Sequence, residues 1–246
     1  SKAKYEVIVG NPPWTSRRGP EHNSIKWCKD NNYPMPSNED AWAFTWKTLS
    51  HLKQNGLASY LVPAMGFLHN PKSFNARSQL VEDAHVSRII NFSDLRFQLF
   101  GGAISPAALI IFGLNVNDTK PYNIEYWSPK ANLNLQIKRS IAIASTDKAI
   151  VSSHEIKQDY FALKARLWMR RVDRRLYKFL SSYERLGDFI KPFGEAKKHD
   201  GEKNYEWFIG QGFQPYNDGR SSNTPHVSQE VVKYPYLPVK AVDRLY

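Results

Sequence analysis

A short apolar run that ends in a rigid tetrapeptide constrains this chain more than any other feature. The run Tyr5–Gly10 is typical of a buried parallel strand, and Asn11-Pro12-Pro13-Trp14, the NPPW segment, follows it directly. The prolines fix the backbone and remove competing donors, so the Asn11 side-chain oxygen and the Pro12 carbonyl can accept hydrogen bonds from one amino group. The Trp14 ring offers a flat face on which a base can stack. The segment therefore predicts a site that holds an exocyclic amine.

The NPPW segment resembles the catalytic motif of the amino-methyltransferases, which is Asp/Asn/Ser-Pro-Pro-Tyr/Phe/Trp at the end of the fourth strand of a doubly wound sheet. Its asparagine form is similar to that of the adenine-specific (N6) DNA methyltransferases of restriction–modification systems. The resemblance implies a catalytic group made of Asn11, Pro12, Pro13 and Trp14. Asn11 and Pro12 would accept from the amino group of a flipped adenine, and Trp14 would stack on its ring. The alternative interpretation is a proline-rich surface turn.

The first half of the chain alternates helix and strand patterns. After the NPPW segment we expect a helix opened by the capping box Ser37–Asp40 and ended by Asn55-Gly56, with its tryptophans in the core. The elements expected next are a strand over 58–63, a helix over 73–84, a strand over 86–92 and a buried antiparallel strand over 107–112. This order matches the second half of the class I (Rossmann-like) methyltransferase sheet, so the predicted fold class is α/β with an antiparallel hairpin.

Two groups of residues near this predicted site are candidate contacts. Residues 15–38 are polar and indicate a long loop, where Arg17 and Arg18 would either meet DNA phosphates or form a solvated charge pair. In the family that the chain resembles, an aromatic residue near the hairpin packs against the target base. Phe97 and Phe100 are the local candidates, although phenylalanine in a hairpin is more often part of the core.

The cofactor of that family is S-adenosylmethionine, which binds at the first half of the sheet. In the adenine enzymes with this motif order those strands precede the catalytic motif, and only ten residues precede Asn11 here. We therefore expect an excised fragment or one piece of a longer polypeptide, inactive by itself. A permuted arrangement is the alternative, because Phe208–Gly212 fits the family's cofactor pattern. Turn residues follow it instead of a helix, which favours a hairpin loop.

The second half of the chain predicts DNA contacts. We assign residues 1–120 to the catalytic domain and residues 121–185 to a connector. The connector is expected to contain a helix over 135–144 and a basic amphipathic helix over 165–183. Residues 186–246 are assigned to the start of a target-recognition domain of partial α+β structure. Leu186-Gly187-Asp188 resembles the beginning of that domain. The candidate DNA contacts are Arg170, Arg171 and Arg174 on the helix and Gln211, Gln214 and Arg220 on a recognition loop. Solvent exposure alone explains such polar residues equally well.

Charge and composition agree with a polyanionic partner. The net charge is +11, with 13 Lys and Arg against 9 Asp and Glu in residues 1–120, and 21 against 14 in the remainder. Double-stranded DNA is the expected partner, together with fused or associated nuclease and specificity regions that the resemblance implies. No apolar run approaches the roughly 20 residues of a membrane span. The single cysteine suits a reducing cytoplasm, bacterial or archaeal, and the histidines show no metal-ligand spacing.

The sequence as a whole predicts a DNA methyltransferase that moves a methyl group from S-adenosylmethionine to the N6 amine of a flipped adenine. Two alternatives remain open at this point. One is an amino-methyltransferase acting on RNA or on protein glutamine, which shares the Asn-Pro-Pro-aromatic motif. The other is a non-catalytic DNA-binding subunit that has kept the fold.

Overall fold

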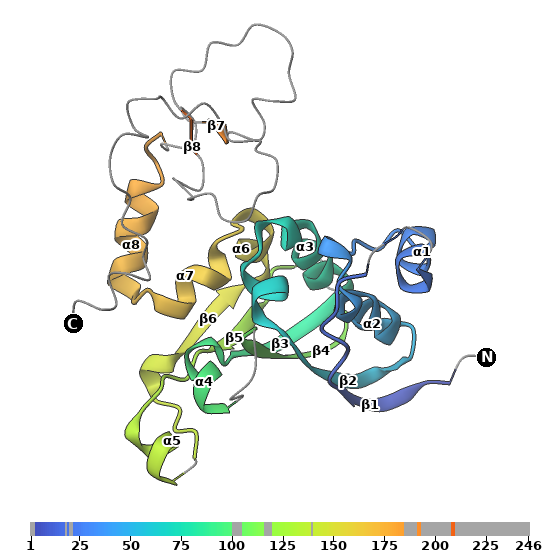
Figure 1. Ribbon diagram of the computed structural model, residues 1–246, viewed down its shortest axis with the longest axis horizontal. Coiled ribbons are helices and arrows are strands. Elements are labelled where there is room, and N and C mark those ends of the chain that lie inside the picture. The colour runs from blue at the N-terminus through green and yellow to red at the C-terminus, as the bar shows by residue number, and fades with distance from the viewer. Residues whose placement is uncertain are drawn as a thin grey trace, which may run out of the picture. The chain divides into compact units, whose positions relative to one another are not determined.

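A six-stranded mixed sheet organises the chain in the computed structural model, which describes residues 3–17, 19, 22–99, 105–115, 120–138, 140–184, 191–192 and 208–209 (Figure 1). The strand order is β1-β2-β4-β3-β5-β6. The strands are β1 Tyr5–Gly10, β2 Leu52–Pro63, β3 Ala84–Asn91, β4 Ala107–Leu114, β5 Asn123–Trp127 and β6 Lys148–Ser152. β1, β2, β3 and β5 run in one direction, whereas β4 and β6 run in the other.

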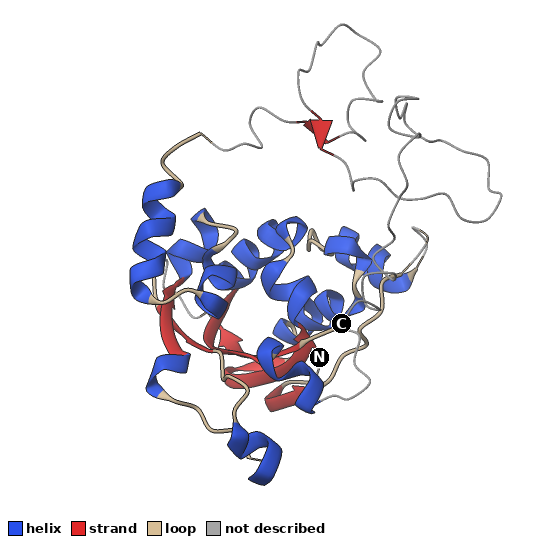
Figure 2. Ribbon diagram, turned by 60° about the vertical axis from the view of Figure 1, so that its left-hand side comes forward, coloured by secondary structure: helices blue, strands red, loops and turns tan. Residues whose placement is uncertain are grey.

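Helices connect and cover the strands. They are α1 Asn23–Asp30, α2 Asp40–Leu49, α3 Phe74–Asp83, α4 Arg96–Leu99, α5 Leu133–Lys138, α6 Ser153–Gln158, α7 Ala162–Trp168 and α8 Arg171–Leu180. Single turns lie at Pro36–Asn38, Pro71–Ser73, Ser93–Leu95 and Ser145–Asp147, and the turn Met65–His69 is π-helical. In Figure 1 α2, α3, α6 and α7 lie along one side of the sheet, and Figure 2 shows the same layer of helices above the strands.

The chain divides into two compact units. The first, residues 1–176, contains the six-stranded sheet. In the second, residues 177–246, the described residues include the last turns of α8 and a parallel pair of two-residue strands, β7 Lys191–Pro192 and β8 Phe208–Ile209.

The core between the sheet and the helices is aromatic. Trp42 and Trp46 of α2 are fully buried, and the Trp42 ring stacks on Phe67 with 3.9 Å between ring centroids. On β4, Ile110 and Phe112 are buried while Leu109 and Ile111 between them are half-buried. This alternation shows that the helices bury one face of the strand more completely than the other. The prediction that the tryptophans of α2 belong to the core is confirmed.

The predicted fold class is confirmed. β2, α3, β3 and β4 occupy the predicted ranges to within a few residues, apart from the early start of β2, and β4 lies antiparallel between β2 and β3. β5 lies parallel to β3 and continues the sheet beyond β4 in the sequence. The resulting order of strand, helix, strand, helix, strand and antiparallel strand is the one expected for the second half of a class I methyltransferase sheet.

The prediction that the first strand is buried was wrong. β1 is an edge strand, and the side chains of Tyr5, Val7 and Val9 are 52%, 67% and 75% exposed. An apolar run identifies a strand, but burial depends on which elements cover it, and among the described residues β1 pairs with β2 alone.

The region between the NPPW segment and β2 also differs from the prediction. The expected long loop contains the helix α1, whose Cys28 is buried. Ser37 and Asn38 both have a φ of 53°, so they do not form a capping box, and α2 starts after Glu39 instead. α2 ends at Leu49, whereas Gly56 lies inside β2. A Cβ at Gly56 would lie 2.8 Å from the Tyr5 carbonyl oxygen, so glycine here permits close strand pairing and not a helix end.

Three predictions for the second half also differ from the structure. The segment assigned to a polar connector contains β6, which together with β5 extends the main sheet beyond residue 120, and the helix expected over 135–144 is the shorter α5. The expected helix over 165–183 is two helices, because the backbone is extended at Met169 and the Arg170 amide donates to the Asp173 carboxylate at 2.9 Å. That hydrogen bond caps the start of a new helix.

Candidate active site

The carboxyl ends of four strands meet at one edge of the sheet, because β1, β2, β3 and β5 are parallel to one another. The NPPW segment follows β1, the π-helical turn Met65–His69 follows β2, and Asn91 ends β3. Ligands of open α/β sheets bind at this edge. The NPPW segment therefore lies at the edge of the sheet where ligands of such folds bind.

Within the NPPW segment the four side chains differ in exposure. Asn11 and Pro13 are exposed, Pro12 is buried and Trp14 is half-buried. The Trp14 indole Nε1 donates a hydrogen bond to the Leu61 carbonyl oxygen of β2 at 3.3 Å. This bond fixes the orientation of the ring and leaves part of its surface free, while the Asn11 amide remains accessible to a ligand.

The glycine before the NPPW segment allows β1 to approach β2 closely. Gly10 lies opposite Tyr60 in the parallel pairing, and a Cβ at Gly10 would lie 2.9 Å from the Tyr60 ring. That ring is held in place because its hydroxyl shares a 2.6 Å hydrogen bond with the Thr48 hydroxyl of α2. Any larger residue at position 10 would move the strand end that carries Asn11.

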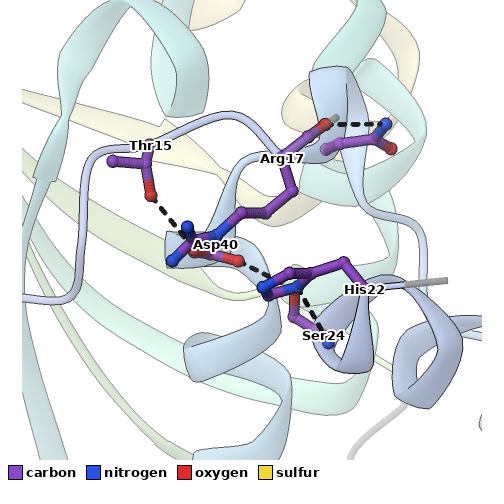
Figure 3. Close-up of polar contacts among 6 residues, drawn as sticks. Thr15, Arg17, His22, Ser24 and Asp40 are labelled. Carbon is purple, nitrogen blue, oxygen red and sulfur yellow. Dashed lines mark hydrogen bonds and ion pairs between the residues drawn. The ribbon is translucent and has the colours of Figure 1, made fainter. Parts of the chain in front are cut away.

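A buried carboxylate secures the chain just after the NPPW segment (Figure 3). Asp40 is 2% exposed and accepts from the Thr15 hydroxyl at 3.0 Å, from the Ser24 hydroxyl at 2.8 Å and from Arg17 Nε. Burial by itself raises the pKa of Asp40. The hydrogen bonds from Ser24, Arg17 and Thr15, together with the charge of Arg17, outweigh that effect and lower the pKa overall.

The neighbouring carboxylate of Glu39 has the opposite environment. It packs against Gly66 in the turn after β2, where any Cβ would overlap it, and its Oε2 atom has no hydrogen-bond partner among the described residues. Burial raises the pKa of Glu39. Sequence reasoning treated Glu39 and Asp40 as helix-capping residues and missed both. Two adjacent acidic residues after a polar segment were the signal that was available.

A buried polar group follows the next strands. The Asn91 amide nitrogen donates to the Tyr126 hydroxyl at 2.8 Å and lies 3.1 Å from His69 Nε2. Burial, followed by the charges of Arg77 and Lys164, lowers the pKa of His69 to about 4. Burial also raises the pKa of Tyr126. No local pattern predicts this group, because its members lie more than 20 residues apart.

The structure describes the positions of some of the other residues predicted to contact DNA or the target base. Arg17 is paired with Asp40, and Phe97 on α4 is 75% exposed with the Arg96 guanidinium 4.9 Å from the centre of its ring. Arg170 is exposed and Arg174 is half-buried. The side chains of Arg18, Phe100, Arg171, Gln211, Gln214 and Arg220 lie outside the described part of the structure. Binding of DNA or of a target base by any of these residues stays a prediction.

The described residues do not fit S-adenosylmethionine by themselves. A pocket of about 810 Å³ lies beside β1, and its walls include Val9, Trp27, Phe44 and Tyr60. None of its lining residues is acidic, so no carboxylate there can accept from the ribose hydroxyls, and the NPPW segment does not line it. The predicted alternative at Phe208–Gly212 is described only at β8, which is a strand.

Two other kinds of feature are absent from the residues that the structure describes. Within the described residues no group of three or more His, Cys, Asp or Glu side chains is placed to hold a metal ion. None of the helices described is both long and apolar enough to cross a membrane.

Residues 1–100 match the sequence model of the Eco57I restriction-modification methylase family. The matched segment contains the NPPW segment, the Asp40 carboxylate and α4 with Phe97. No curated protein matches the chain.

Several solved structures that resemble this chain come from restriction–modification systems. A chain of a type I system is 16% identical with a TM-score of 0.49, covering 73% of this chain and 42% of that one. The methyltransferase subunit of a type I system from Streptococcus thermophilus is 18% identical with a TM-score of 0.48, covering 67% and 38%. The type IIG restriction endonuclease BpuSI is 14% identical with a TM-score of 0.46, covering 73% and 22%. The chain thus spans about two fifths or less of these structures.

Proposed function

We propose that this chain is part of a DNA methyltransferase of a restriction–modification system, and that the methyl group goes to the N6 amine of an adenine flipped out of double-stranded DNA. The observation that carries the proposal is the NPPW segment at the carboxyl end of β1, with the Trp14 ring oriented by its hydrogen bond to β2. The family match over residues 1–100 and the net charge of +11 support it.

Each residue of the NPPW segment has a role in this proposal. The exposed Asn11 amide oxygen and the Pro12 carbonyl accept the two hydrogens of the adenine amine, which orients the nitrogen lone pair away from them. Trp14 stacks on the base, and Pro13 keeps the turn rigid. The amine becomes more acidic as it is attacked, so the chain needs no strong general base to release a proton to solvent.

S-adenosylmethionine would supply the methyl group, and residues outside the described part of the structure would bind it. We infer that a further polypeptide segment covers the open edge and exposed apolar side chains of β1 and carries the cofactor site. The fold of the described residues supports this inference, because β1 exposes side chains that a strand in the middle of an α/β sheet buries.

Methyl transfer by the natural polypeptide that contains this sequence tests the proposal. Labelled S-adenosylmethionine is incubated with double-stranded DNA, RNA or protein, and label in N6-methyladenine of DNA is the expected result. Asn11→Ala should lower the rate by about 100-fold or more while the Kd for DNA stays within about two-fold, because one preorganised hydrogen-bonding group is lost at the reacting atom.

The matched control is Asn75→Ala, which removes an exposed asparagine from α3 and should leave the rate unchanged. Label in RNA or protein instead of DNA would transfer the proposal to another substrate class. DNA binding without any methyl transfer would indicate a non-catalytic subunit. Full activity of Asn11→Ala would refute the role of the NPPW segment.

A further inference from the structure

Asp40 joins three separate parts of the chain beside the NPPW segment. Its two carboxylate oxygens accept hydrogen bonds from Thr15 and Arg17, which follow the NPPW segment, and from Ser24 on α1. Asp40 itself is the first residue of α2, and its side chain is almost completely buried. Figure 3 shows these donors converging on the carboxylate from different elements.

Main-chain hydrogen bonds reinforce the same junction. The Asp40 amide donates to the Thr15 carbonyl at 3.0 Å, and the Arg17 amide donates to the Asn38 carbonyl at 2.9 Å. Ser16 and Glu39 form an antiparallel bridge between these two bonds. Residues 15–17 are therefore held against residues 38–40 as a short two-stranded ribbon that begins immediately after Trp14.

The junction continues into α1. The Ser24 hydroxyl that donates to Asp40 also lies 2.7 Å from His22 Nδ1, and the same imidazole nitrogen accepts from the Ser24 amide at the start of the helix. Asp40 thus fixes the chain both before and after the stretch between Arg17 and α1. The NPPW segment is anchored by Trp14 to β2 on one side and by Thr15 to α2 on the other.

We propose that Asp40 is a positioning residue for the reaction, which holds Thr15 and Arg17 so that Asn11 and Trp14 keep the orientation that a flipped base requires. The inference rests on the proposed function and extends it to a residue outside the NPPW segment. Asp40 does not touch the substrate in this proposal. It acts through the ribbon, and small displacements of groups that orient a reacting atom reduce rates strongly.

Asp40→Asn tests the proposal because it keeps the size of the side chain and removes the charge and one acceptor oxygen. We expect kcat for methyl transfer to fall about 10- to 100-fold at saturating DNA and cofactor, with the Kd for DNA and the KM for S-adenosylmethionine within about two-fold. A role in folding alone would lower the amount of active protein or its Tm and leave kcat per active site unchanged.

The pair Thr15→Val and Thr15→Ser gives a second test if Asp40→Asn fails to fold. Thr15→Val removes the hydroxyl that donates to Asp40 and should lower kcat several-fold, whereas Thr15→Ser keeps the hydroxyl and should retain it. The matched control is Glu155→Gln, which removes the charge paired with the buried Arg166 in the α6–α7 region. It should reduce stability and leave kcat unchanged.

Hydrogen exchange measures the same positioning without relying on activity. Asp40→Asn should speed exchange at the Arg17 and Asp40 amides, which close the ribbon, whereas Glu155→Gln should leave these amides unchanged. Faster exchange together with an inactive natural protein would support the anchoring by Asp40 and refute the proposed function. An unchanged kcat in Asp40→Asn and Thr15→Val, or unchanged exchange of the ribbon amides, would overturn the proposal.

Discussion

The two ends of the sheet differ in how completely the described residues bury the side chains of the strands. At the β1 end Val7 and Val9 are mostly exposed, whereas at the other end Ile124, Tyr126 and Val151 are fully buried. Both ends are built from apolar strand sequences of similar length. Helices α6 and α7 follow β6 and close that end, but no described element covers the outer edge of β1. The NPPW segment therefore belongs to the end that the described residues leave open.

Ion pairs show the same contrast. Lys53 and Glu6 join β2 to β1 at 2.8 Å, and both side chains are more than half exposed. At the closed end Arg166 is buried, makes two hydrogen bonds to the Glu155 carboxylate and donates to the carbonyls of Ile150 and Ala162. The Lys53–Glu6 pair therefore remains in solvent, whereas Arg166 is integrated into the core.

A carboxylate introduced at each end of the sheet should give the largest difference in the free energy of unfolding. Val151→Asp places an unpaired carboxylate in the closed core and should lower the free energy of unfolding by about 4 kcal/mol or more. Val9→Asp should change it by no more than about 0.5 kcal/mol in this chain, because the side chain already contacts solvent. Urea unfolding of both variants measures the comparison.

The Val9→Asp and Val151→Asp variants also test the proposal that another segment covers β1. In a longer polypeptide that contains such a segment, Val9→Asp should become strongly destabilising. Equal effects of Val9→Asp in the short and long polypeptides would contradict that proposal.

The dependence of stability on pH should reveal the buried His69. Its folded-state pKa of about 4 lies below the ordinary value of 6.5, so the unfolded chain binds the additional proton between these two pH values. Stability should therefore be complete above pH 6.5 and fall by up to about 3 kcal/mol as the pH decreases to 4. His69→Asn should remove this part of the pH dependence in urea unfolding at several pH values.

The exposed His154 provides the control for this measurement. His154→Asn should retain the pH dependence of the wild type. If His69→Asn and the wild type differed by a constant amount at every pH, the buried and neutral state of His69 would be disproved.

The smallest effects should come from the ion pairs. Glu155→Gln is expected to cost about 1–3 kcal/mol because a buried guanidinium loses a charged acceptor. Lys53→Met should cost no more than about 0.5 kcal/mol, since solvent and salt screen the exposed pair. Thermal unfolding at low and high salt separates the two, and a Lys53→Met effect as large as that of Glu155→Gln would remove the contrast between the ends.

Much of the fold followed from local patterns. Continuous apolar runs located β2, β3 and β4, and helical spacing placed Trp42 and Trp46 in the core. The helix in the polar segment before α2 was harder to predict from the sequence. Its N-cap residue is His22, and histidine is not a usual helix cap. The sequence analysis did not predict β6, because its apolar and polar residues do not alternate regularly and only one of its five residues is buried.

The candidate site also has one part that the sequence identifies and one part that only the structure reveals. The NPPW segment is contiguous, so its chemistry can be recognised from the order of its residues. The Asp40 junction joins residues 15, 17, 24 and 40, and the spacing of these positions matches no periodic pattern. The antiparallel ribbon between residues 15–17 and 38–40 brings Thr15, Arg17 and Asp40 together, and Ser24 joins them from α1.

The sequence by itself determined the strand that ends in Asn-Pro-Pro-Trp, the alternation of strands and helices and the basic charge, because each depends on residues close together in the chain. The tertiary structure decided that β1 is an open edge, that β6 completes the opposite end and that Asp40 is buried among three donors. Burial and hydrogen-bond partners are properties of surfaces brought together from distant parts of the chain, and local residue order does not specify them.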